Sequence, residues 1–285
     1  MRFSERHGYA PVRSVLQTNS IDTSLRNRIW NLINMEFFED APTVAGSQDY
    51  LPNYSDAHSR FMLLSHHFFK EAVDEIPLSY YRAVQRLRTY FFGCQWYSIY
   101  DLIEFLANSL SNFTEKEKFI RSVNAVLKDE MAGYRFVSGR IVQITSEEEV
   151  ACIEQAVALP HPLKPVTTHL RQALALLAEK KDPDYRNSIK ESISAIESLS
   201  KILSGLPNAT LSPALNAVEK HAKLHPSLKE AFQKVYGYSS DAQGIRHALM
   251  DEPTLDLEDA KFMLVSCSAF VNYMVVKAQK ADIKI

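Results

Sequence analysis

The chain has 285 residues, of which 8 are glycine; an average usage of roughly 7% would give about 20. Loops that bind phosphate through backbone amides need clustered glycines, and neither G-x-G-x-x-G nor G-x-x-x-x-G-K-[ST] occurs here. The low glycine count and the missing motifs argue against a P-loop NTPase and a Rossmann dehydrogenase. Hydrophobic residues make up 46% of the chain, which predicts a globular protein. The net charge of -2 does not indicate nucleic-acid binding.

Apolar residues recur with helical spacing through the first half of the chain. Over residues 20–38, behind an N-cap at Ser20 or Asp22, the spacing places Leu25, Ile29, Leu32 and Met35 on one buried face. Residues 45–57 are rich in Gly, Pro, Asn, Ser and Asp and predict a loop. Further helices are predicted over residues 58–74, 79–92 and 96–110, and from a capping box formed by Thr114 and Glu117.

One segment departs from the helical pattern. Residues 134–144, YRFVSGRIVQI, hold two short β-type runs joined by Ser138 and Gly139, and glycine supplies the positive φ of a tight turn. We predict a β-hairpin here. Because an isolated hairpin is only marginally stable, it should pack against helices. A helix capped by Ser146 and Glu149 is predicted to follow, to about residue 158.

The sequence LPHPLKP at 159–165 marks the best domain boundary, because prolines at this density do not continue a helix. The predicted fold is mainly α in two helical domains, 1–158 with the hairpin and 159–285. Helices of the second domain are predicted over residues 166–180, 184–204, 212–223, 226–236, 240–250 and 256–280. The last of these is apolar almost all round and is expected at the buried centre of a bundle.

Cysteine usage and the chain ends give the expected compartment. Cys94, Cys152 and Cys267 are far apart and form no C-x-x-C pair, so neither a disulfide framework nor a zinc site is expected. The N-terminal segment is polar and lacks the apolar run of a signal peptide, and the longest apolar stretch, 262–276, is too short to span a bilayer. We therefore expect a cytoplasmic protein without a membrane partner.

The second half contains YRNSIKESISAIESLSKIL and LHPSLKEAFQKVYGYSSDAQGIRHALMDEP before the closing apolar helix. These segments resemble the HEPN superfamily, small helical bundles of prokaryotic toxins and antiviral systems. The first half, from FSERHGYAPVRSVLQTNSIDTSLRNRIWNLI to GYRFVSGRIVQIT, resembles the N-terminal module of the abortive-infection AbiJ group. Together the resemblances imply an anti-phage, abortive-infection or toxin-type protein with an AbiJ-type domain at 1–158 and a HEPN-like helical bundle at 159–285.

Active HEPN members are metal-independent endoribonucleases with an R-x4–6-H motif, and two protomers combine their motifs in one site. Arg246 matches the motif arginine, and His247 follows it. Asp251 stands where the shortest motif has histidine, and Glu252 and Pro253 fill the longer spacings. The resemblance implies RNA as the substrate, a homodimer through the C-terminal domain, no cofactor and no DNA partner. It also implies a partner protein from a defence system.

The residues themselves allow two interpretations of R-H-x3-D. If 244–251 are helical, His247 and Asp251 are i,i+4 neighbours, so that Asp251 fixes the tautomer of His247 as acid or base while Arg246 holds a phosphate. Alternatively, Arg246 and Asp251 secure a helix end and His247 packs at a polar interface. The chain would then be a catalytically inactive HEPN-like module that binds RNA, a nucleotide or a partner protein.

Two further sets are weaker candidates for substrate binding. Asn187 and Glu191, with Glu197, lie on the 184–204 helix, which in the resemblance lines the cleft beside Arg246. Arg82 and Arg86 alternate with tyrosines in YYRAVQRLRTY, a pattern suited to single-stranded RNA but more often the solvated side of a core helix. His58 and His66, about two helical turns apart, are too distant to share one metal without ligands from elsewhere in the chain.

Overall fold

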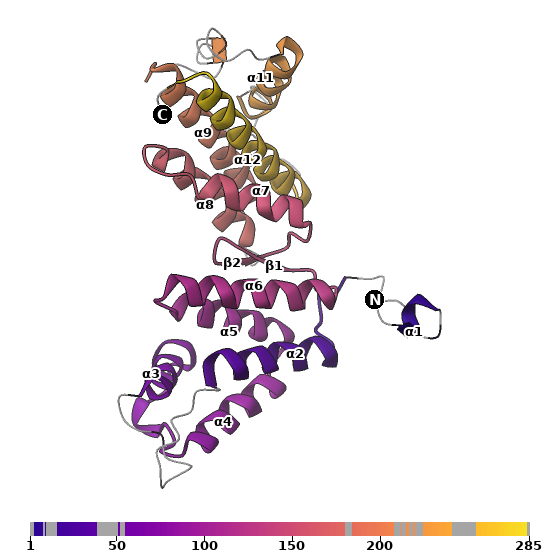
Figure 1. Cartoon of the computed structure of the whole chain (residues 1–285), viewed down its shortest axis with the longest axis vertical. Helices are drawn as coiled ribbons and strands as arrows, with labels where there is room; N and C mark the ends of the chain where they lie inside the picture. Colours follow the sequence, from indigo (N-terminus) through magenta and orange to yellow (C-terminus); the bar gives the residue numbers. More distant parts are fainter. Residues whose placement is uncertain are drawn as a thin grey trace, which may run out of the picture. The chain divides into compact units, whose positions relative to one another are not determined.

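The computed structural model describes residues 3–7, 9, 16–38, 51, 55–179, 184–207, 212, 215, 216, 219, 225–240 and 255–283. Within these residues helices dominate and the named strands form one two-stranded hairpin, which confirms the mainly α fold class (Figure 1). The chain packs as two compact units, Met1–Ile141 and Val142–Ile285. The domain boundary after residue 158 stays a prediction, because packing units do not define where a family domain ends.

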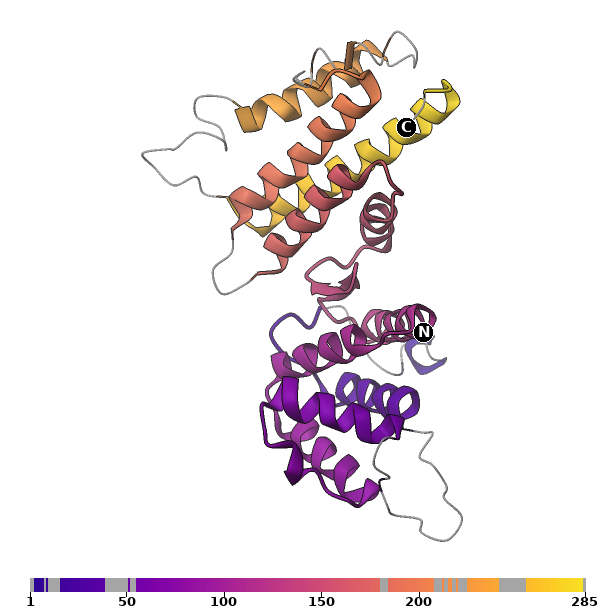
Figure 2. The ribbon, with the colours of Figure 1, turned by 90° about the vertical axis from the view of Figure 1, so that its left-hand side faces the viewer.

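Unit 1 is a helical bundle followed by the hairpin (Figure 2). Its elements are α1 (Phe3–Arg6), α2 (Thr23–Ile33), η1 (Asn34–Phe38), α3 (Asp56–Leu63), η2 (Leu64–Phe69), η3 (Val73–Glu75), α4 (Tyr80–Gly93), α5 (Trp96–Ser109), α6 (Phe113–Asp129), β1 (Arg135–Val137) and β2 (Arg140–Val142). Side-chain caps begin most of the longer helices. Asp22 caps α2 as predicted, by accepting from the Leu25 N–H at 2.8 Å.

Two helices differ from the predictions: α6 in the residue that caps it, and the first predicted helix in the residues that it buries. Asn112, not Thr114, caps α6, because its side chain accepts from the first free backbone amides of the helix. In the first predicted helix, residues 34–38 form the π-helix η1. A wider π turn changes the helical repeat, so Met35 is 57% exposed while Phe37 and Phe38 are buried.

The predicted hairpin is confirmed, together with its packing on helices. Ser138 and Gly139 both have positive φ, 50° and 79°, as a type I′ turn requires. From α6, the Asn124 side chain donates to the Phe136 carbonyl at 3.0 Å and accepts from the Phe136 N–H at 2.8 Å. From α5, the Glu104 carboxylate accepts from the Ile141 N–H at 2.6 Å. Two helices therefore satisfy backbone groups of both strands.

An N-terminal strap, residues 16–22, joins the start of unit 1 to the segment that follows α6. The Gln17 N–H donates to the Met131 carbonyl at 2.8 Å, and the Gly133 N–H donates to the Gln17 carbonyl at 2.9 Å. The Gln17 side chain also donates to the Glu130 carbonyl at 2.7 Å. Gly133 has no room for a side chain, because an added Cβ would lie 2.6 Å from Thr18 Cγ2.

Unit 2 is a second helical bundle, made of α7 (Glu147–Val157), α8 (Lys164–Ala178), α9 (Tyr185–Ser204), α11 (Pro226–Ser240) and α12 (Leu257–Lys280). Helix α8 packs along α9, and α12 packs against α9, α7 and α8. Pro165 lies in the first turn of α8, where its missing N–H costs nothing. The predicted helix over 240–250 lies outside the described residues apart from Ser240, and most of the helix over 212–223 does too.

Helix α12 is less enclosed than the sequence predicts. Its buried side carries Ala260, Met263, Leu264, Cys267, Ser268, Phe270, Val271, Met274, Val275 and Ala278. Phe262 and Val276 are nevertheless 62% and 43% exposed, because the neighbouring helices cover one side of α12. By length and composition alone α12 is apolar enough to cross a membrane, and half of its most apolar window is buried inside the protein.

Candidate functional site

The predicted catalytic residues Arg246, His247 and Asp251 lie outside the residues that the structure describes. Their roles therefore stay predictions. The other residues assigned to the same site, Asn187 and Glu191, are on α9 in unit 2. The side chains around α9 are consequently the part of the candidate site whose geometry is described.

The most notable contact on α9 is a histidine–carboxylate pair. His169, on α8, has its Nδ1 atom 2.7 Å from Oε2 of Glu191. The Glu191 side chain is 17% exposed and that of His169 is 33% exposed, so the pair lies at the edge of the bundle. A carboxylate that accepts from Nδ1–H fixes the imidazole tautomer and leaves Nε2 to exchange a proton. This is the chemistry expected of His247 with Asp251, at another place in the chain.

The two other polar candidates on α9 also have partners within the chain. Asn187 donates from its side chain to Asp184 at 2.6 Å, and Asp184 caps the helix through the Asn187 N–H. Glu197 accepts from the Tyr236 hydroxyl at 2.6 Å, which connects α9 to α11. These bonds give Asn187 a local capping role and Glu197 a role in joining two helices.

The partners His169 and Tyr236 are not predictable from the sequence pattern. They lie 22 and 39 residues from Glu191 and Glu197, on helices whose rotation about their axes decides which side chains meet. Helical spacing predicts neighbours only three or four residues apart on one helix. A signal for these two pairs is therefore missing from the pattern of α9 alone.

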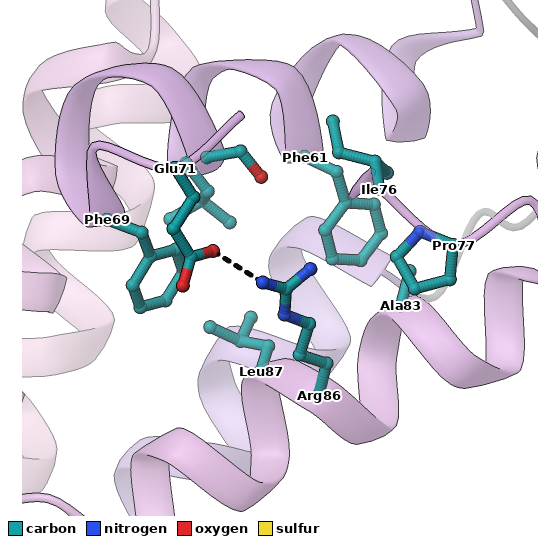
Figure 3. Close-up of a pocket in the computed structure, with 10 residues that line it drawn as sticks. Phe61, Phe69, Glu71, Ile76, Pro77, Ala83, Arg86 and Leu87 are labelled. Carbon is teal, nitrogen blue, oxygen red and sulfur yellow. Dashed lines mark hydrogen bonds and ion pairs between the residues drawn. The ribbon is translucent and has the colours of Figure 1, made fainter. Parts of the chain in front are cut away.

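In unit 1, Arg86 of α4 is paired with an acidic residue. Its guanidinium donates to the Glu71 carboxylate at 2.7 Å (Figure 3). It also donates to the Glu75 carbonyl at 3.2 Å. Behind this pair lies a small apolar pocket of about 20 Å³, which has room for about one water molecule, lined among others by Phe61 and Leu87. Arg86 is thus one of the residues that line this pocket in unit 1.

Arg82 is exposed on the same helix, as expected of a charged residue opposite an apolar stripe. The stripe itself is buried, with Ala83 and Leu87 at 3% and 2% exposure. Arg88 places its guanidinium 4.7 Å from the centre of the Phe92 ring, a cation–π contact within the helix. Of the arginines on α4, two are thus occupied by contacts inside unit 1.

Burial changes the acid–base behaviour of a few groups. Burial raises the pKa of Glu104 above the ordinary carboxyl value, although the Ile141 N–H and Arg140 partly offset this effect. Burial also raises the pKa of the Cys94 and Cys152 thiols, which makes both poorer nucleophiles. Among the described residues, no three His, Cys, Asp or Glu side chains are grouped so that they could hold a metal ion.

Comparison with known proteins identifies the first part of the chain. Residues 1–159 match the family model described as AbiJ N-terminal domain 4, which confirms the resemblance of the first half. No curated protein and no solved structure gives a significant match. The AbiJ domain indicates an abortive-infection, defence-type function. Because the match covers more than half of its 285 residues, this chain belongs to the AbiJ N-terminal domain 4 family.

Proposed function

We propose that the chain is a cytoplasmic abortive-infection protein whose C-terminal, HEPN-like unit cleaves RNA as a homodimer and without a metal ion. One observation carries the proposal: the AbiJ N-terminal domain match ends at residue 159, and the rest of the chain, which belongs to the helical unit 2, contains Arg246, His247 and Asp251 in its sequence. The N-terminal domain would sense the trigger or restrain the toxic unit, and a defence-system protein would be its partner.

The proposed reaction is attack of a ribose 2′-hydroxyl on the adjacent phosphate. His247 of one protomer removes the hydroxyl proton, and the second copy protonates the leaving 5′-oxygen. Asp251 orients His247, and Arg246 stabilises the charge that develops on the phosphate. Metal ions are not needed for this chemistry, because protein side chains supply the base, the acid and the positive charge.

Helix α9 has a supporting role in this proposal. Glu191 and Asn187 are already bonded to His169 and Asp184, at 2.7 and 2.6 Å. We therefore assign them to holding α9 in place beside the site, and not to direct contact with RNA.

The test is RNA cleavage in EDTA by the purified chain and by Arg246→Ala and His247→Ala. Removing a general acid–base residue such as His247 lowers rates by about 10²- to 10⁴-fold, and removing a group that stabilises developing charge, as Arg246 does, lowers them by about 10²- to 10³-fold. Both variants should therefore lose at least about 100-fold. Arg121→Ala and His161→Ala are matched controls, since both residues are exposed and distant in sequence from the motif. Equal cleavage by the wild type and both motif variants would reject this site.

An inactive HEPN-like module that binds RNA, a nucleotide or a partner protein is the second candidate. One observation favours it: Asp251 stands where the motif has histidine. A filter-binding measurement on the same proteins tests this function. Wild-type protein that retains RNA on the filter but leaves it uncut in the cleavage assay would support the binding function over the nuclease.

A further inference from the structure

The last helix, α12, has a second apolar face directed away from its bundle. Phe262, Ala269 and Val276 are all exposed and follow one another at intervals of seven residues. Seven residues are about two turns of an α-helix, so these three side chains form one line, which we call the outer stripe. In Figure 1, α12 lies in front of α9, the helix against which it packs most extensively.

The residues that flank the outer stripe are also suited to an interface. Val265 and Tyr273 are half-buried beside it. A hollow of about 370 Å³ lies next to Phe262, between α11 and α12, and is lined by Lys234 and Asp259. An exposed apolar stripe with a polar rim is typical of a surface that binds another protein.

We propose that the outer stripe binds the outer stripe of a second copy, with the two α12 helices antiparallel and a two-fold axis at Ala269. In a two-fold interface the same surface of both copies is in contact, so each residue must fit the residue of the partner to which the axis brings it. Phe262 and Val276 are each seven residues from Ala269, and Phe262 therefore meets the partner's Val276. The small Ala269 at the centre lets the helices approach closely.

The charges on α12 select the antiparallel orientation. Its first turn is acidic, with Glu258 and Asp259, and its last turn is basic, with Lys277 and Lys280. Glu258 lies eleven residues before Ala269 and Lys280 lies eleven residues after it. In the antiparallel pair each acidic end faces the partner's basic end, whereas a parallel pair would place like charges together.

This inference rests on the proposed function in one respect, namely that two C-terminal units meet. The antiparallel pair places the two starts of α12 about 36 Å apart, at 1.5 Å per residue. The chain from His247 to Leu257, about 33 Å long when extended, is long enough in each copy for the two motifs to reach one phosphate. The outer stripe adds the surface and the register, and its tests measure association without RNA. A dimer that survives in Ala269→Arg would reject the outer stripe and leave the nuclease proposal standing, whereas a wild type that is monomeric at all concentrations would reject both.

The first test compares the mass of the full-length chain by sedimentation over a concentration series with that of Ala269→Arg. The wild type should form dimers and Ala269→Arg should be monomeric, because the axis places the two new arginines against each other. Phe113→Arg is the matched control, since Phe113 is 75% exposed in unit 1, and it should dimerise like the wild type. A circular dichroism spectrum shows whether each variant folds. A monomeric wild type at all concentrations, or a dimer that survives in Ala269→Arg, would overturn the inference.

Cysteine cross-linking tests the register, in a background with Cys94 and Cys152 replaced by serine. Disulfides need Cβ atoms only about 4 Å apart, so Ala269→Cys at the axis should cross-link with itself. Phe262→Cys and Val276→Cys should each remain uncrosslinked alone and should cross-link when the two proteins are mixed. Self-cross-linking of Phe262→Cys would indicate a parallel pair and would reject the antiparallel arrangement.

A membrane is the competing occupant, because α12 is long and apolar enough to enter one. The wild type should remain in the supernatant when it is sedimented with vesicles of neutral and anionic phospholipid. Co-sedimentation that Ala269→Arg abolishes would assign the stripe to lipid and overturn the proposed pairing.

Discussion

Asn124 binds both backbone polar groups of Phe136, donating to its carbonyl at 3.0 Å and accepting from its N–H at 2.8 Å. The pair fixes β1 on α6 with a side chain that mimics a neighbouring strand. Asn124→Ala would leave these half-buried groups without their partner. We expect it to lower the free energy of unfolding by about 2–3 kcal/mol, measured by urea denaturation.

Asn108→Ala is the matched control for this variant. Asn108 donates to the Gly139 carbonyl at 3.0 Å in an exposed position of the same hairpin, where water replaces the lost bond. The control should lose less than about 1 kcal/mol. Equal losses of unfolding free energy for Asn108→Ala and Asn124→Ala would show that the two hydrogen bonds from Asn124 to Phe136 have no special role.

Gly133→Ala should destabilise unit 1 by steric overlap. The new Cβ would lie 2.6 Å from Thr18 Cγ2 and 3.1 Å from the Gln17 carbonyl oxygen, so the strap must move. We expect a loss of about 1–3 kcal/mol in urea denaturation. Thr18→Ser, which removes Cγ2, should restore part of that loss in the double variant. Gly93→Ala, where nothing lies within 4 Å, should be neutral or stabilising.

Glu104 should make unit 1 less stable as the pH rises. Burial raises its pKa in the folded state, so the folded chain binds this proton more tightly than the unfolded chain does. Stability from this group is therefore fully present below the ordinary carboxyl pKa and is lost as the pH rises through the raised value. Glu104→Gln keeps an acceptor for the Ile141 N–H and should remove this part of the pH dependence.

The measurement is the free energy of unfolding of the wild type and Glu104→Gln in urea, at a series of pH values. The difference should be small in acid and should favour Glu104→Gln increasingly toward neutral pH. Glu115→Gln, on the exposed first turn of α6, serves as the control and should show no such trend. A difference in the opposite direction would contradict the assigned cause.

Tyr236→Phe should loosen α11 from α9. The Tyr236 hydroxyl donates to the Glu197 carboxylate at 2.6 Å, and a hydrogen bond to a charged group contributes about 1.5–3 kcal/mol. Amide hydrogen exchange in residues 226–240 should become faster, while exchange in α12 should change less. Tyr97→Phe, at a position 53% exposed in unit 1, should leave the exchange of α11 unchanged.

The sequence predicts those features of this fold that depend on near neighbours. The Asp22 cap and the Ser138–Gly139 turn are set by residues two or three positions apart, and the structure confirms both. The π turn that exposes Met35 is not predictable in this way, because periodicity arguments assume a constant 3.6-residue repeat.

The same distinction between near and distant neighbours applies to the candidate site. Sequence selects Glu191 and Glu197 on α9 but does not predict that His169 and Tyr236 are bonded to them. Those contacts depend on how α8 and α11 are rotated against α9, which is settled by the packing of the whole bundle. The roles of Arg246 and His247 rest on resemblance alone.

The N-terminal strap also has a consequence for synthesis on the ribosome. Gln17 pairs with Met131 and Gly133, and the Tyr134 hydroxyl reaches the Thr18 carbonyl at a separation of 116 residues. Because a chain emerges from its N-terminus onward, the bonds of the strap to residues 130–134 cannot form until that segment has left the exit tunnel. These contacts of the defence domain therefore form late, and a product truncated before residue 130 lacks the partners that hold its first segment.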